Sequence, residues 1–252
     1  MKSNATCPII VTGAAQGLGR AFAKRFAKVG HPVVVADIRG ETAEALAEEI
    51  RCSGGSAIAV TLDVTDAESA THMVHTCCET FGGLGVLVNN ASVFSTLKMR
   101  PFDEIPVAEW RQVIDVNLTG VYLCSRAAAP PMKAARWGRI VNIASAAVPM
   151  GRPHYLHYVS SKAGVIGLTR GLAKELGEWN ITVNAVLPGA TDTEIERETV
   201  TPQQRENLIS ARSIRRAQGV DDLTGVVQFI ASDECGFVTG QSLVVDGGTV
   251  FL

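Results

Sequence analysis

Short apolar runs alternate with longer amphipathic stretches along most of this 252-residue chain. The apolar runs show no in-and-out alternation, so each predicts a strand that is buried on both faces. Stretches with helical spacing separate them, and this rhythm is typical of a parallel sheet covered by helices on both sides. The predicted strands are 8–12, 33–36, 57–62, 86–88, 140–144, 181–187 and 243–245, and the predicted helices include one ending before Gly30, 42–51, 67–81, 107–132 and one through 155–177. The pattern therefore predicts an α/β fold.

Composition narrows the class of protein. Hydrophobic residues make up 46% of the chain and charged residues 19%, which suits a chain with a substantial core. The formal net charge is −2 and the pI about 6.2, so a nucleic-acid partner, which favours a basic excess, is not expected. No repeat, linker or low-complexity tract divides the sequence. We therefore expect a single domain over residues 1–252.

Cysteine usage and the N-terminus predict the compartment. None of the six cysteines stands in a C-x-x-C pair, and no His/Cys spacing is typical of zinc, so we expect free thiols and no metal. The residues before the first glycine motif are too few and too mixed for a signal peptide, and no apolar stretch reaches the roughly 18 residues of a membrane span. We expect a soluble, cytoplasmic protein without a membrane partner.

A glycine-rich turn follows the first predicted strand and opens the first helix. Gly13, Gly17 and Gly19 would let the backbone approach a pyrophosphate, toward which the helix N-terminus directs its N–H groups. Asp37 ends the second strand, where a carboxylate accepts hydrogen bonds from the adenosine ribose and repels a 2′-phosphate. This arrangement predicts binding of NAD rather than NADP. Arg39 is the opposing signal, since it lies close enough in sequence to meet a phosphate.

A second motif carries the candidate chemistry. Tyr158 and Lys162 are four residues apart, so on a helix they share one face. An ammonium near a phenol pulls its pKa from about 10 toward neutrality, which suits a general acid or base. Ser145, thirteen residues upstream, ends a buried strand at the sheet edge where α/β proteins hold ligands. By itself the pair fits a packed ring beside a solvated charge better than it fits a catalytic site.

Together these motifs resemble the short-chain dehydrogenase/reductase family in its single-domain branch of about 250 residues. The resemblance covers essentially the whole chain. It rests on Thr12-Gly13-x-x-x-Gly17-x-Gly19, Asn89-Asn90-Ala91, Asn117, Ser145, Tyr158-x-x-x-Lys162, Pro188-Gly189 and Val245-Asp246-Gly247-Gly248. It implies a three-layer, Rossmann-like, doubly wound parallel sheet and an NAD(P)-dependent enzyme that interconverts secondary alcohols and ketones.

The resemblance assigns a catalytic tetrad of Asn117, Ser145, Tyr158 and Lys162. Ser145 would orient the substrate oxygen, and Tyr158 would exchange a proton with it. Lys162 would favour the phenolate and hold the nicotinamide ribose, while Asn117, in a kinked long helix, would place a relay water. The implied cofactor contacts are Gly13, Gln16, Gly17, Leu18, Gly19, Asp37, Ile38, Asp63, Val64, Asn90, Ala91, Tyr158, Lys162, Pro188, Gly189, Thr191 and Thr193. Taken alone, Asp63 is equally compatible with a helix cap.

Two positions depart from the family pattern. Ser92 stands where glycine is usual after Asn89-Asn90-Ala91, so its backbone should avoid the angles that only glycine favours. Thr191 stands where an aliphatic residue is more common. Both changes predict a reshaped pocket and intact catalytic chemistry.

The substrate end is the least defined part of the sequence. Position in the motifs predicts a mainly apolar pocket, suited to a medium-sized secondary alcohol or ketone, formed by Phe94, Ser145, Ala146, Val148, Met150, His154, Tyr155 and Ala190. A lid is expected at about 191–218. The arginines of this lid could bind an anionic substrate or form a solvated mixed-charge surface with its glutamates. The arginines are Arg197, Arg205, Arg212, Arg215 and Arg216, and the glutamates are Glu194, Glu196, Glu198 and Glu206.

Two other functions fit the same motifs. A 3-oxoacyl-(acyl-carrier-protein) reductase would share the tetrad, but that branch prefers NADP and presents basic residues to its carrier protein. Arg136 fits such a patch, whereas Trp179 stands where a second basic residue would be expected. A non-catalytic dinucleotide sensor is the other possibility, since fold alone does not establish activity. The resemblance also implies a homotetramer built on the helices at 107–132 and 155–177.

Overall fold

Seven parallel strands form one sheet in the computed structural model, which describes residues 6–195 and 202–252. The spatial order is β3-β2-β1-β4-β5-β6-β7, so the chain reverses direction across the sheet between β1 and β4. The strands are β1 (Ile9–Thr12), β2 (Val33–Asp37), β3 (Ala57–Thr61), β4 (Val86–Asn89), β5 (Gly138–Ile143), β6 (Ile181–Pro188) and β7 (Ser242–Val245). Each predicted strand is confirmed to within about two residues at either end, and so is the doubly wound fold.

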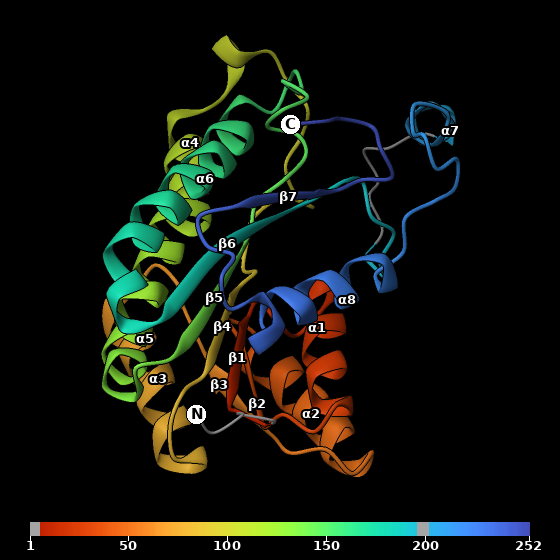
Figure 1. The fold of residues 1–252 in the computed structure, drawn as a ribbon. Helices are drawn as coiled ribbons and strands as arrows, with labels where there is room; N and C mark the ends of the chain where they lie inside the picture. The colour runs from red at the N-terminus through yellow and green to blue at the C-terminus, as the bar shows by residue number, and fades with distance from the viewer. Residues whose placement is uncertain (1–5, 196–201) are drawn as a thin grey trace.

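Helices cover both faces of the sheet (Figure 1). One layer holds α1 (Gly17–Lys28), α2 (Gly40–Cys52) and α8 (Asp221–Ile230). The other layer holds α3 (Ala67–Phe81), α4 (Val107–Ile114), α5 (Gly120–Ala135) and α6 (Leu156–Leu176). Among the described residues, no helix has the length and apolar character that a membrane crossing requires.

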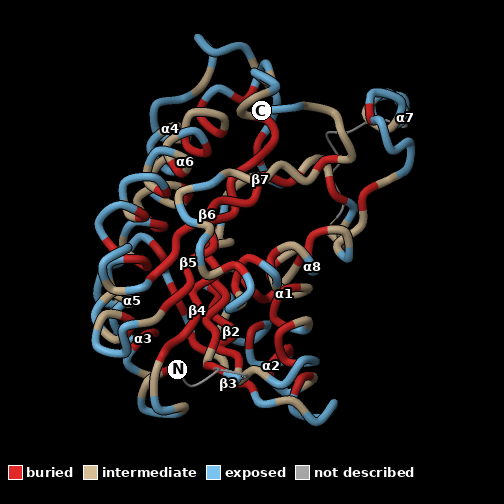
Figure 2. The backbone as a smooth tube through the Cα atoms, viewed as in Figure 1, coloured by how far each residue is buried: buried red, intermediate tan, exposed pale blue. Residues whose placement is uncertain are grey.

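Strands β1, β2, β4, β5 and β6 are buried because each face of the sheet packs on its own hydrophobic cluster, whereas the edge strands β3 and β7 are only partly buried. Val33 and Val35 of β2 face the α1, α2 and α8 layer, where they meet residues such as Phe22 and Leu46. Val34, between them, faces the opposite layer and packs in the cluster that contains Met73. Figure 2 shows this buried centre as a continuous red zone along the strands. The uninterrupted apolar runs in the sequence follow from this double coverage.

The predicted helix at 107–132 begins at the expected residue, directly after Pro106, but is not one regular helix. A π-helical turn at Asp115–Thr119 separates α4 from α5, and α5 continues past Pro130 and Pro131 to Ala135. A π turn widens the helix by one residue and re-aims the side chains it contains. The π turn therefore accounts for the kink that the family resemblance implies at Asn117.

The segment between β6 and α8 forms a loop whose two ends meet. Thr191 and Gln218 pair in an isolated parallel bridge, and the Asp192 N–H donates to the Gln218 carbonyl at 2.8 Å. Helix α7 (Pro202–Ser210) lies within this segment and stands apart from the sheet (Figure 1). Neither α7 nor α8 was predicted. The polar sequence of α7 has no apolar stripe that could have indicated a helix, because it packs little against the body.

Candidate active site

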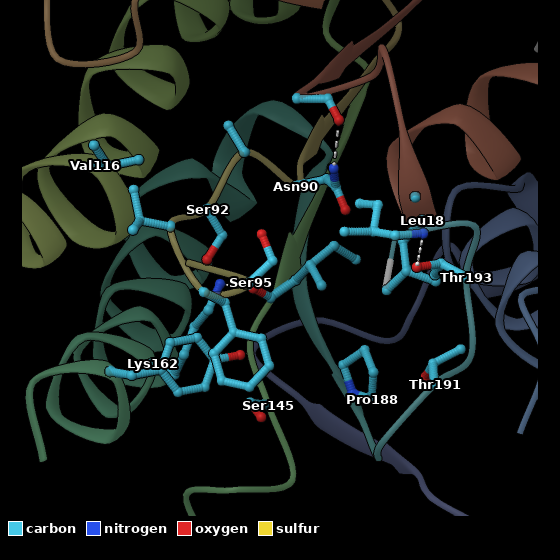
Figure 3. A pocket seen from close by; sticks show the side chains of 18 of the residues that line it. Leu18, Asn90, Ser92, Ser95, Val116, Ser145, Lys162, Pro188, Thr191 and Thr193 are labelled. Atoms are coloured by element: carbon cyan, nitrogen blue, oxygen red, sulfur yellow. Dashed lines mark hydrogen bonds between the residues drawn. The ribbon is translucent and has the colours of Figure 1, made fainter. Parts of the chain in front are cut away.

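A cavity of about 600 Å³ opens at the carboxyl ends of the strands, beside the reversal between β1 and β4. Open α/β sheets bind ligands at this point because loops from both halves diverge there. All predicted cofactor residues line the cavity except Gly19. Figure 3 shows Ser145 and Lys162 on one side of the cavity and Leu18, Thr191 and Thr193 on the other. The loops that contribute these residues leave the same edge of the sheet, so residues far apart in the sequence meet there.

The glycine turn approaches β4 so closely that side chains do not fit. A Cβ at Gly13, whose φ is +60°, would lie 2.7 Å from the Ala91 Cα. A Cβ at Gly19 would lie 2.2 Å from the Gly13 carbonyl oxygen, so Gly19 is a packing position behind the turn. Asn90 braces the turn, since its Nδ2 donates to the carbonyls of Thr12 and Gly13 at 3.0 Å each.

The first turn of α1 already holds an anion. The Gly17 N–H donates to the Glu194 Oε1 at 2.7 Å, and Glu194 belongs to the segment after β6. A helix N-terminus concentrates free N–H groups and the positive end of the helix dipole, which is why carboxylates and phosphates bind there. Glu194 shows that these N–H groups are aimed at an anionic group, so the turn fits a dinucleotide pyrophosphate.

Asp37 is fixed at the end of β2 by backbone and side-chain donors. Its carboxylate is 5% exposed; Oδ2 accepts the Ala15 N–H at 3.0 Å, and Oδ1 accepts the Arg39 N–H at 3.0 Å. The Arg39 guanidinium lies 3.3 Å from the same oxygen and also donates to the Gln16 side chain. Arg39 is therefore held against Asp37 at the cavity rim.

Ser145, Tyr158 and Lys162 meet at the opposite end of the cavity. Ser145 lies two residues beyond β5, and its hydroxyl accepts the Ala147 N–H at 3.1 Å, which fixes the oxygen beside the cavity. Tyr158 and Lys162 share one face of α6, with the Lys162 Nζ 5.8 Å from the centre of the Tyr158 ring. The Phe94 ring lies 4.3 Å from the Tyr158 ring and holds it in place.

Lys162 is the most strongly perturbed base among the described residues. The side chain is 2% exposed, and its Nζ donates to the Ile143 carbonyl at 2.8 Å. Burial lowers the pKa of the ammonium to about 7 from 10.5, because a charged group loses its hydration there. A lysine with this pKa exchanges protons near neutral pH, so Lys162 can take part in acid–base chemistry.

Asn117 lies outside the cavity wall. It is fully buried in the π turn, where its Oδ1 accepts the Val93 N–H at 2.7 Å and its Nδ2 donates to the Val93 carbonyl at 3.1 Å. Nδ2 also lies 3.3 Å from the Ser161 hydroxyl. Asn117 therefore ties the loop after β4 to α6, next to Tyr158.

Comparison with known proteins decides the family. The family model for short chain dehydrogenases matches residues 8–204. The chain belongs to the short-chain dehydrogenase family. It is an oxidoreductase that acts on CH–OH groups with a nicotinamide dinucleotide.

Individual members of the family are similar over nearly the whole chain. A 3-oxoacyl-(acyl-carrier-protein) reductase of Staphylococcus aureus is 38% identical over 95% of this chain and 96% of its own. An L-rhamnose 1-dehydrogenase (NAD(P)(+)) of Azotobacter vinelandii is 39% identical over 95% of both chains. The solved structure of a 7α-hydroxysteroid dehydrogenase with NADH and 7-oxo glycochenodeoxycholic acid is 33% identical, with a TM-score of 0.91 over 96% of this chain and 93% of that one.

The residues predicted to contact substrate do not all reach the cavity of this short-chain dehydrogenase. Phe94, Ala146, Met150 and Ala190 line it together with Ser145. Val148, His154 and Tyr155 do not: His154 is exposed in a left-handed turn with φ 65°, and Tyr155 is buried behind Phe94 with its ring 5.6 Å away. These three residues were predicted to contact substrate because they lie close to the motifs in the sequence. The sequence does not show how the turn before α6 orients their side chains.

Four polar residues of the cavity were not predicted from the sequence: Ser95 and Thr96 of the loop after β4, Gln112 of α4 and Arg152 of the loop before α6. Arg152 lies six residues before Tyr158. Residues six apart do not share one face of a helix, so this spacing gave no indication that both line one cavity. Ser92 also lines the cavity, and its φ is not positive, as the sequence predicts. Thr191 contributes its hydroxyl to the Gly189 carbonyl at 3.1 Å.

Most lid arginines have structural roles. Arg205 pairs with Asp192, and Arg216 pairs with Asp222, in place of the expected glutamates. Arg212 is buried, contrary to the expected solvated surface, and donates to the carbonyls of Ala190 and Arg216. Arg215 is exposed and does not line the cavity. Arg197, Glu196 and Glu198 lie outside the described residues.

Proposed function

We propose that this short-chain dehydrogenase interconverts a secondary alcohol and a ketone with NAD(H), and that Tyr158 is the general acid/base. The observation that carries the proposal is the convergence of Ser145 and Tyr158 with the glycine turn around one cavity. A group that exchanges a proton must reach the reacting oxygen in the same space where the cofactor binds. The segments that follow β1 to β6 contribute residues to this one cavity, which supports the proposal.

The proposed roles follow from the positions of the side chains. The Ser145 hydroxyl accepts a backbone N–H and keeps its own proton available for the substrate oxygen. The Tyr158 Oη takes the alcohol proton in oxidation and returns it in reduction. A protonated Lys162 beside the ring stabilises a phenolate by its charge, and its burial makes this charge act through little solvent. Nicotinamide, when bound, supplies the hydride chemistry.

NAD is the proposed cofactor because of Asp37. Its carboxylate lines the cavity at the end of β2, where an adenosine ribose would approach, and two backbone N–H groups keep it oriented. A 2′-phosphate placed there would meet this charge at close range. Arg39 is already engaged by Asp37 and Gln16, so recruiting it to a phosphate would break both contacts.

The test is turnover of a panel of secondary alcohols, sugars, hydroxyacids and 3-hydroxyacyl thioesters, followed by NADH absorbance. Tyr158→Phe should bind NADH with wild-type affinity in a fluorescence titration and lose turnover. Unchanged turnover would refute Tyr158 as the base. A wild-type protein that binds NADH but turns over none of the panel would instead support the dinucleotide sensor.

A second candidate is reduction of a 3-oxoacyl thioester carried by an acyl-carrier protein. The observations that favour it are the similar reductase of Staphylococcus aureus and a small basic cluster outside the cavity. Lys133 and Arg136 each stand 5.6 Å from the centre of the Trp179 ring. Trp179, which stands where a second basic residue was expected, therefore packs with these two cations. An acidic carrier protein would meet two cations and an aromatic ring at this surface.

Cofactor and carrier assays separate the two candidates. The main proposal expects a higher kcat/KM with NAD than with NADP, and equal use of a carrier-linked and a free 3-oxoacyl thioester. A strong NADP preference, together with faster turnover of the carrier-linked thioester that Arg136→Glu abolishes, would establish the second candidate.

We also propose a single catalytic domain that assembles as a homotetramer through α4, α5 and α6. The support is family membership and the exposed apolar side chains of Val107, Tyr122 and Leu156 on these helices. Light scattering coupled to size-exclusion chromatography measures the assembly state directly. A monomer at micromolar concentration would contradict the tetramer and leave the chemistry unaffected.

A further inference from the structure

Arg152 stands at the reaction end of the cavity without a carboxylate partner in the described part of the chain. The arginines that do pair with carboxylates there are Arg20, Arg39, Arg51, Arg100, Arg139, Arg205 and Arg216. Arg152 instead lines the cavity together with Ser145 and Tyr158, and its guanidinium carbon lies 5.3 Å from the centre of the Tyr155 ring. A guanidinium stacked on a ring keeps its N–H groups free at its edge.

The position of Arg152 is fixed relative to the catalytic groups. Its backbone N–H donates to the Ala147 carbonyl at 3.1 Å, two residues beyond Ser145. On the side-chain face, Tyr155 is buried, packs against Phe94 at 5.6 Å, and Phe94 packs against Tyr158 at 4.3 Å. A stack of three rings thus connects the guanidinium to the proposed acid/base. A group held by Arg152 would have a defined distance from the reacting carbon.

The net charge of the side chains that line the cavity differs in sign between its two ends. Of the charged side chains that line it in residues 6–195 and 202–252, Asp37, Arg39 and Asp63 belong to the adenosine end. Only Arg152 and Lys162 belong to the reaction end, and both are cationic. Lys162 is committed to the Ile143 carbonyl and the tetrad, which leaves Arg152 as the group available to a substrate.

We infer that Arg152 binds a carboxylate of the substrate, so that this enzyme acts on hydroxy or oxo acids whose carboxylate lies several bonds from the reacting carbon. The inference rests on the proposed function and specifies its substrate class. A carboxylate matches the charge and fork geometry of one guanidinium, whereas a phosphate monoester carries nearly twice the charge and this end supplies no second free cation among the described residues.

The experiment compares oxo acids with their methyl esters as substrates for NADH oxidation. The pairs are 5-oxohexanoate, 6-oxoheptanoate, 7-oxooctanoate and 4-oxocyclohexanecarboxylate, with cyclohexanone and 2-heptanone as neutral ketones. In at least one pair the acid should have a kcat/KM about tenfold or more above that of its ester, mainly through KM, because a charge-assisted hydrogen bond is lost in the ester. Arg152→Gln should reduce this ratio to near one, and Arg152→Lys should restore part of it.

Arg215→Gln is the matched control, because it removes the same charge from an exposed lid position that does not line the cavity. It should keep the wild-type preference for acids. If neutral ketones and esters are turned over as well as the acids, or if Arg152→Gln keeps the preference, the inference is wrong and the proposed function stands. If neither acids, esters nor neutral ketones are turned over, the proposed function fails and the inference fails with it.

Discussion

The buried Lys162 should make the stability of this enzyme depend on pH in a window that one substitution removes. In the folded protein, burial holds the pKa of the ammonium at about 7, against 10.5 for an exposed lysine. Between these values the unfolded chain binds one proton that the folded protein does not. The free energy of unfolding should therefore rise with pH from about 7 to about 10.5, and level off below and above that window.

The slope follows from proton linkage. A difference of one bound proton changes the free energy of unfolding by about 1.4 kcal/mol for each pH unit. Over the whole window, the free energy of unfolding therefore changes by roughly 5 kcal/mol because of Lys162. Lys162→Met keeps the length of the side chain and removes the proton. The lost hydrogen bond to the Ile143 carbonyl changes stability by an amount that is independent of pH, so it leaves the slope unaffected.

Urea denaturation of both proteins at equal concentration, from pH 7.5 to pH 9.5, measures the effect. The difference in unfolding free energy between wild type and variant should change by roughly 2–3 kcal/mol over these two pH units. Buried thiols, such as that of Cys124 with its pKa raised by burial to about 12, contribute equally to both proteins and cancel. Lys174→Met, an exposed position on the same helix, should keep the wild-type slope. Parallel curves for wild type and Lys162→Met would refute the argument.

Three further predictions concern the cofactor end and the π turn. Glu194→Gln should strengthen NADH binding about two- to fivefold in a fluorescence titration, because its carboxylate competes for the Gly17 N–H; weaker binding would contradict this. Asp37→Ser should raise the kcat/KM ratio of NADP over NAD at least about tenfold, and an unchanged ratio would remove Asp37 as the discriminating residue. Asn117→Ala should destabilise the protein by about 1–3 kcal/mol in urea denaturation, because the Val93 N–H and carbonyl both lose their partner; a loss of turnover without any loss of stability would assign Asn117 a purely chemical role.

The parts that the sequence predicts well are those whose local pattern and tertiary environment agree. Strands β1, β2, β4, β5 and β6 are buried on both faces, so their apolar runs are continuous, and Gly13 and Asp37 stand at strand ends that the runs themselves define. The π turn at Asn117 has no such pattern in the sequence, and it contacts α4, α5 and α6. Helix α7 is mainly polar, and its adjacent apolar residues Leu208 and Ile209 give no periodic signal.

The substrate end escaped prediction for a related physical reason. Gln112, Arg152 and Leu208 come from α4, a loop and α7, and only the folded chain brings them to one cavity. Arg152 is positioned by a turn in which Gly151 and His154 have positive φ, and this turn rotates His154 out of the cavity while it leaves Arg152 in. The number of residues that separate Arg152 and His154 from Tyr158 predicts neither orientation.

The two ends of the cavity are built differently, and this difference explains why the reaction is better defined than the substrate. The groups proposed for chemistry stand on buried elements: Lys162 is anchored to the last residue of β5, and Asn117 joins the loop after β4 to α6. Displacing any of them would disrupt the core. The substrate end consists of side chains on the loops and helices that follow β4, β5 and β6, where changes leave the sheet intact. A substitution at Arg152 can therefore alter which alcohol or ketone is accepted, while the proton transfer at Tyr158 stays supported by the sheet and α6.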